Sequence, residues 1–107
     1  MNKQQLNTKL TLDALGVPAQ TGSFDQRLMT QKSIYLARAA GHDCGYYFRW
    51  YLRGLYSPDL TRDVFSIVAE LDSGMDESAD WQLDSDSLQK LNGLRGLIPP
   101  YKSPDAA

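Results

Sequence analysis

The sequence predicts a single α+β domain, mainly α, with about four helices and a small two-stranded element. A winged-helix-like arrangement is one way in which these elements could be assembled. The chain has 107 residues, which suffices for one hydrophobic core rather than two. Apolar residues recur at helical spacing in four segments, and a fifth segment alternates with the period of a strand. We expect the domain to span 1–98 and the proline-rich tail 99–107 to be extended.

The first two helices are predicted over about 3–15 and 24–40. A glycine and a proline soon after residue 15 stop the first helix, and Ser23 with Gln26 predicts a capping box at the start of the second. Each helix carries apolar residues on one face, which we expect to point into the core. These residues are Leu6, Leu10, Ala14 and Val17 in the first helix, and Phe24, Leu28, Met29, Tyr35, Leu36 and Ala39 in the second.

The segment 46–52 is predicted to be a strand because its residues favour strands and alternate with period two between Gly45 and Gly54. A helix would also align several of its apolar residues and is the alternative. We expect the strand to pair with a short strand at 81–83. The inner face would hold Tyr46, Phe48, Trp50 and Leu52, and the outer face Tyr47, Arg49, Tyr51 and Arg53.

The clearest local signal is Ser57 followed by Pro58 and Asp59, which predicts a third helix over about 58–72. A last helix is predicted over about 86–95, with Ser85 or Ser87 as its cap. The apolar stripes are Leu60, Val64, Ile67, Val68 and Leu71 in the third helix, and Leu88, Leu91, Leu94 and Ile98 in the last.

Composition excludes several classes of protein. The formal net charge is −2, which argues against a strongly basic nucleic-acid binder, although 26–63 carries a net +3 and 64–107 a net −5. A single cysteine, Cys44, excludes a disulfide framework within the chain. No apolar run is long enough to span a membrane and the first residues lack a signal segment, so a cytoplasmic location is expected.

No motif indicates catalysis. His42, Asp43 and Cys44 are adjacent, whereas metal ligands are usually spaced so that two side chains converge on one ion. A turn is therefore the expected structure there. The G-x-x-G sequence at 93–96 resembles the backbone clamp of KH domains, but four letters are a weak signal and Leu94 belongs to the leucine stripe. We expect no enzyme activity, no cofactor and no metal.

Lys32 falls on the apolar face of the second predicted helix. Its stem can pack against neighbours while the amine reaches solvent. Alternatively, it pairs with Asp59 or Asp63 in a partly buried ion pair, or contacts a ligand directly. The structural ion pair that we predict is Lys32 with Asp63.

Six of the eleven aromatic residues lie in 46–56, beside Arg49 and Arg53. Many of these rings are needed for the core of a small domain. The outward-facing set suits a protein interface, where tyrosine, tryptophan and arginine dominate, or stacking on single-stranded nucleic acid. The predicted partner-binding residues are Tyr47, Arg49, Tyr51, Arg53 and Tyr56.

Two runs, QKSIYLA at 31–37 and GYYFRWYLRGLYSPDL at 45–60, are followed by Asp63. Together they resemble a loosely defined bacterial and phage group that is distantly similar to the SocA-type antitoxin (Panacea) domain. The resemblance covers roughly 28–100, and Leu55 stands where the group usually has proline. It implies a small, helical, non-catalytic domain used in toxin neutralisation or phage–host conflict, and it supplies no functional residues to carry over.

The sequence therefore supports two hypotheses about function. The first is an antitoxin-like, or phage-defence or counter-defence, module that binds a protein partner; the alternative is a nucleic-acid-binding transcriptional regulator of winged-helix type. Relatives are expected to continue into a further helix beyond the two prolines at 99 and 100. We therefore expect an open apolar patch and a homodimer through it. The residues of this patch are Leu88, Leu91, Leu94 and Ile98.

Overall fold

A computed structural model of the chain describes residues 1–52 and 54–95. These residues confirm the predicted α+β class, mainly α, with four α-helices and one small antiparallel sheet. The predicted extended tail, 99–107, lies outside the described residues. The elements are α1 (Lys3–Leu15), α2 (Phe24–Ala39), β1 (Arg49–Tyr51), β2 (Gly54–Tyr56), α3 (Pro58–Asp72), the 3-10 helix η1 (Glu77–Asp80) and α4 (Ser85–Asn92).

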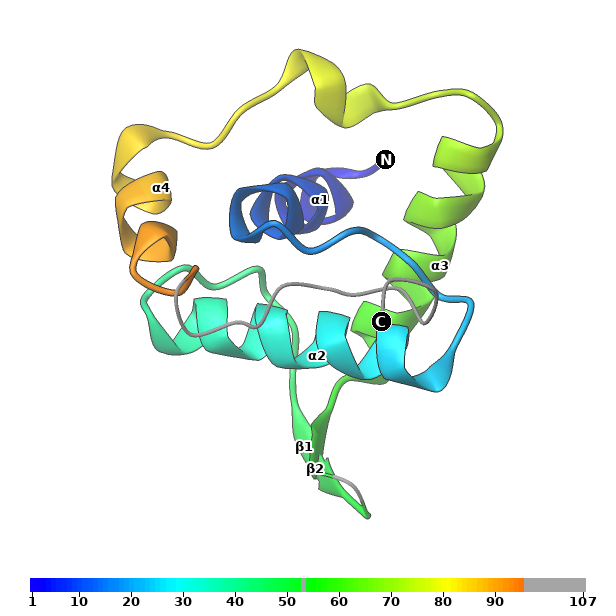
Figure 1. Ribbon diagram of the computed structural model, residues 1–107, viewed down its shortest axis with the longest axis vertical. Helices are drawn as coiled ribbons and strands as arrows, with labels where there is room; N and C mark the ends of the chain where they lie inside the picture. Colours follow the sequence, from blue (N-terminus) through cyan, green and yellow to red (C-terminus); the bar gives the residue numbers. More distant parts are fainter. Residues whose placement is uncertain (53, 96–107) are drawn as a thin grey trace, which may run out of the picture.

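Helix α1 lies at the centre of the molecule. In Figure 1 it is surrounded by α2, α3, α4 and the segment that carries η1, and it contacts each of them. A helix enclosed in this way has no single buried face, and the predicted stripe was only partly right. Val17 is buried and Ala14 packs against the core, but Leu6 and Leu10 are only half-buried. Leu12 and Thr8, which the stripe left out, are fully buried. Thr8 can be buried because its hydroxyl donates to the Gln4 carbonyl at 2.8 Å.

Helix α2 begins with the predicted capping box, in which the Gln26 N–H donates to Ser23 Oγ at 3.1 Å. Its predicted core face was right only at Met29 and Leu36, which pack against the core. Thr30 and Ser33 face the core instead, together with Ile34 and Ala37, while Phe24 and Tyr35 are exposed. The two hydroxyls donate to carbonyls one turn earlier in the same helix, which lets these polar side chains be buried. The part of the predicted face that carries Phe24 and Tyr35 points out of the core.

The strand predicted at 46–52 is shorter, and it turns back on itself. β1 pairs antiparallel with β2, with Trp50 opposite Leu55, so the predicted pairing with 81–83 was wrong. The reason is Gly54, whose φ of 116° is accessible mainly to glycine. This angle lets Gly54 pair directly with Tyr51, so that the chain reverses between them. In Figure 1 the resulting hairpin projects away from the helices.

Helix α3 begins as predicted. Ser57 Oγ accepts a hydrogen bond from the Leu60 N–H at 3.3 Å, Pro58 is the first helical residue, and the stripe from Leu60 to Ile67 is buried. The cap of α4 differs from the prediction, because Asp84 rather than a serine accepts from the Ser87 N–H, at 2.7 Å. Aspartate is an equally good cap, so the helix starts one residue earlier than expected.

The predicted self-association patch is not an open surface. Leu91 is 1% exposed and Leu94 is buried, because α4 packs directly on α1 and turns these leucines into the core. Leu88 is 43% exposed, and Ile98 lies outside the described residues. Burial of Leu91 and Leu94 within the chain removes the contiguous patch from which the homodimer was predicted.

Candidate functional site

Six of the ten large apolar side chains that are exposed among the described residues lie on or beside the hairpin and on the adjoining face of α2. Trp50 is 79% exposed and Leu52 is fully exposed, although alternation predicted both to face inward. The predicted inner face is right only at Tyr46 and Phe48, which are buried, whereas Tyr47, Arg49 and Tyr51 of the predicted outer face are exposed. We call this region the hairpin surface; its members are Tyr47, Trp50, Tyr51 and Leu52 of the hairpin, and Phe24 and Tyr35 of α2.

Four of the five predicted partner-binding residues lie in the hairpin or just before it, and they differ in their surroundings. Tyr47 is 70% exposed, and the Arg49 guanidinium lies 5.5 Å from the centre of its ring. Tyr51 meets Tyr56 edge to face, with ring centres 5.4 Å apart. Tyr56 is half-buried, and its hydroxyl accepts a hydrogen bond from Thr61 at 2.8 Å. Arg53 lies outside the described residues.

The base of the hairpin is fixed to two helices by the buried amide of Gln31. The Ser57 N–H donates to Gln31 Oε1 at 2.9 Å. The same amide's Nε2 donates to the Ser57 carbonyl at 2.9 Å and to Thr61 Oγ1 at 2.8 Å. Gln31 therefore ties α2 to the residue that ends the hairpin and caps α3. On the other side of the base, Tyr35 and Phe48 meet edge to face at 5.5 Å.

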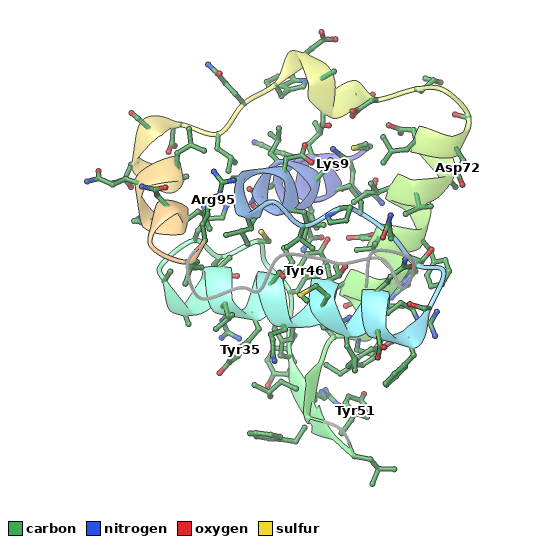
Figure 2. The ribbon with its side chains drawn as sticks, viewed as in Figure 1. Lys9, Tyr35, Tyr46, Tyr51, Asp72 and Arg95 are labelled. Atoms are coloured by element: carbon green, nitrogen blue, oxygen red, sulfur yellow. The ribbon has the colours of Figure 1, made fainter. Side chains whose placement is uncertain are left out.

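Two open pockets lie between the hairpin and α2, and Leu28, Gly54 and Leu55 line both of them. One is a pocket of about 480 Å³ with Arg27 as its charged lining residue; we call it the arginine pocket. The other, of about 520 Å³, has Tyr35 and Trp50 in its wall; we call it the lysine pocket because Lys32 lines it. Figure 2 shows Tyr35 on the hairpin side of α2 and Tyr51 on the hairpin itself.

Lys32 and Asp63 do not form the predicted ion pair. Lys32 is exposed and lines the lysine pocket, one residue after the inward-facing Gln31. Asp63 accepts hydrogen bonds from Tyr46 Oη at 2.7 Å and from Gln5 Nε2 at 3.1 Å, on the α1 side of the hairpin base. Figure 2 shows Tyr46 between α1 and α2. Burial raises the pKa of the Tyr46 hydroxyl, so it stays a proton donor to Asp63.

His42 and Cys44 meet at the hydroxyl of Thr11. His42 Nε2 lies 3.0 Å from Thr11 Oγ1 and 2.9 Å from Asn7 Oδ1, and Cys44 Sγ lies 3.5 Å from the same hydroxyl. Burial raises the pKa of the Cys44 thiol and lowers the pKa of the His42 ring. A buried, protonated thiol is a poor nucleophile, so this arrangement holds the 42–46 segment against α1 rather than activating a sulfur.

Metal-binding geometry is not found in the described part of the chain, where no group of three or more His, Cys, Asp or Glu residues is placed to hold an ion. Over the same residues, no helix has the length and the apolar character needed to cross a membrane. No protein-family model, curated protein or solved structure matches the chain.

Sequence reasoning missed Trp50, Leu52 and the pocket-lining face of α2. The signal that could have found them is Gly54, because a glycine just after two central residues of an alternating run is typical of a hairpin turn. Read as a turn rather than the end of one strand, Gly54 places Trp50 and Leu52 at a projecting tip.

Proposed function

We propose that the chain is a non-catalytic protein-interaction module that binds its partner through the hairpin surface. The observation that carries this is the exposure of Trp50 and Leu52 at the tip of a hairpin whose base is held rigidly by Gln31. Tryptophan and tyrosine dominate the energetic centres of protein interfaces. A soluble domain rarely presents such a group of apolar side chains without a partner to cover them.

The partner that we propose is a toxin or another component of phage–host conflict, so that the module would act as an antitoxin or a defence protein. The support for this is the resemblance of 31–37 and 45–60 to the antitoxin-like group. The two runs meet in space, since Gln31 of the first hydrogen-bonds Ser57 of the second. The two runs thus contain both the base of the hairpin, where they meet, and its exposed tip at Trp50 and Leu52.

The test is co-expression of the chain with the products of its neighbouring genes, followed by native mass spectrometry. We expect a complex that is lost in Trp50→Ser and kept in Trp81→Ser. Trp81 is a matched control because it is 62% exposed but lies next to η1, remote from the hairpin. A neighbouring toxin should also arrest growth in cells that carry Trp50→Ser. A complex that survives Trp50→Ser, or the absence of any complex, contradicts the proposal.

A second candidate function is binding of nucleic acid by the same hairpin. The specific observation that favours it is the exposure of all three β1 residues, with Arg49 beside the ring of Tyr47. Aromatic and guanidinium groups of this kind stack on unpaired bases. Fluorescence anisotropy with labelled single-stranded oligonucleotides at low salt tests it, and binding would have to weaken steeply with added salt. No binding at low salt removes this candidate.

A further inference from the structure

The lysine pocket combines an apolar wall with a cation, Lys32, that is not held in an ion pair by any described residue. Its lining includes the exposed ring of Trp50, the ring of Tyr35 and the side chain of Lys32. Among the described residues Lys32 forms no ion pair, and the acid that also lines the pocket, Asp25, lies two helical turns away on α2. A carboxylate entering this pocket would therefore meet an ammonium group that forms no ion pair with any described acid.

The arginine pocket likewise combines an apolar wall with a cation. Phe24, Tyr51 and Leu52 contribute to its apolar lining, and Arg27 is its charged member. One guanidinium nitrogen of Arg27 donates to the Thr21 carbonyl at 2.9 Å, which holds the group at the pocket and leaves its charge uncompensated by that bond. Both pockets share Leu28, Gly54 and Leu55, so a single ligand can occupy both.

The distribution of charge over the whole molecule also favours an acidic ligand at the pockets. Acidic residues are concentrated from Glu70 to Asp86, and in Figures 1 and 2 this segment lies across α1 from the hairpin, with Asp72 at the opposite end of the view from Tyr51. The cations at the pockets are therefore far from the main acidic segment. Two cations, Arg27 and Lys32, and one acid, Asp25, line the two pockets, so the net positive charge of their linings favours a partner of the opposite sign.

We propose that the two pockets together bind an acidic peptide segment of the partner protein. Two bulky apolar side chains would enter the two pockets, with carboxylates of the segment placed against Arg27 and Lys32. This proposal rests on the proposed function and adds to it the chemistry of the partner. Apolar contacts supply the attraction, and the two cations select acidic over basic segments.

Selection from a phage-displayed library of random dodecapeptides tests the proposal. On the wild-type chain we expect a consensus with two bulky apolar residues and at least one Asp or Glu. A synthetic consensus peptide should bind Lys32→Glu at least tenfold more weakly, and selection on Lys32→Glu should replace the acid by Lys or Arg. Lys3→Glu is the matched control, since Lys3 is exposed on α1 and makes the same charge change away from the pockets. It should keep the wild-type consensus.

The outcomes separate the two proposals. A consensus that depends on Trp50 but lacks acids, or a peptide bound equally by wild type and Lys32→Glu, overturns the acidic-segment proposal and leaves the hairpin surface as a binding site. A selection without any Trp50-dependent peptide overturns both. Peptide binding that weakens as the chain's own concentration is raised would assign the pockets to a second copy and overturn the acidic-segment proposal. Circular dichroism of each variant confirms that Lys32→Glu and Trp50→Ser remain folded, as expected for exposed positions.

Discussion

Gln31 connects three parts of the fold through one buried side chain. Replacing it by alanine removes the acceptor of the buried Ser57 N–H and the donor to Thr61. An unsatisfied buried donor costs about 1–3 kcal/mol, so we expect Gln31→Ala to lower the free energy of unfolding by about 2 kcal/mol in urea titrations. Gln89→Ala, on the exposed side of α4, is the control and should change it by less than about 0.5 kcal/mol. Equal effects of the two substitutions would show that the Gln31 bonds do not stabilise the fold.

A second prediction at this scale concerns pH. Burial lowers the pKa of His42 below the ordinary value of 6.5, so the unfolded chain takes up this proton at a higher pH than the folded chain does. The stability contribution of the neutral ring is therefore present above pH 6.5 and is lost as pH falls from 6.5 through the lower pKa of the folded state. Between pH 7.5 and 5.5, wild type should lose more stability than His42→Asn. Parallel stability curves for the two proteins would contradict this.

Side chains such as Thr8, Thr30 and Ser33 explain why the buried faces of α1 and α2 could not be predicted. Hydrophobic periodicity treats these residues as polar, and it therefore places them outside. Each of the three donates its hydroxyl proton to a carbonyl four residues earlier, which satisfies the group without solvent. The predicted apolar stripe of α2, by contrast, is divided: Phe24, Leu28 and Tyr35 line the pockets, whereas Leu36 packs against the core.

At the scale of the elements, the hairpin depends on the backbone of one glycine. A Cβ on Gly54 would meet nothing within 4 Å, so Gly54→Ala is strained only by its φ of 116°. We expect this substitution to lower the free energy of opening the hairpin by about 1–3 kcal/mol, measured by amide exchange in β1 and β2. Gly93→Ala is the control: Gly93 has helical angles and open space around it, so alanine should be neutral or stabilising there. Similar losses in both variants would mean that the φ of Gly54 does not limit the turn.

Helix α4 provides another prediction because one of its faces is buried and the other is exposed. Leu91→Ala should cost about 2–5 kcal/mol, since Leu91 is 1% exposed against α1. Leu88→Ala should cost less than about 1 kcal/mol, since Leu88 is 43% exposed. Thermal and urea unfolding measure both. A costly Leu88→Ala with a neutral Leu91→Ala would reverse the assignment of the buried face.

Local sequence signals predicted where the helices begin. They failed to predict the strand pairing and the pockets, which depend on contact between distant segments. The caps at Ser23 and Ser57 depend on residues three positions away, so the sequence alone suffices to find them. The partner of β1 was misassigned to 81–83 because either pairing satisfies the alternation. The candidate site was predicted in part: Tyr47, Arg49 and Tyr51 are exposed, whereas the pockets arise from packing of the hairpin on α2.

At the scale of the whole molecule, the hairpin surface is the largest group of exposed apolar side chains among residues 1–52 and 54–95. We therefore expect sedimentation velocity to show a monomer at low micromolar concentration and association at hundreds of micromolar. Trp50→Ser should reduce this association, and Leu88→Lys should leave it unchanged. The reverse result, with association lost only in Leu88→Lys, would return the dimer interface to the last helix.

The position of Trp50 and Leu52 beyond the core has a consequence for evolution and for engineering. Neither side chain supports the packing of the helices, since Trp50 is 79% exposed and Leu52 fully so, and the hairpin is secured at its base by Gln31 and Ser57. Substitutions at 50–52 can therefore change what the domain recognises without compensating changes elsewhere in the chain. If the hairpin surface binds a partner as proposed, single substitutions at its tip can alter recognition while the packing of the helices stays the same.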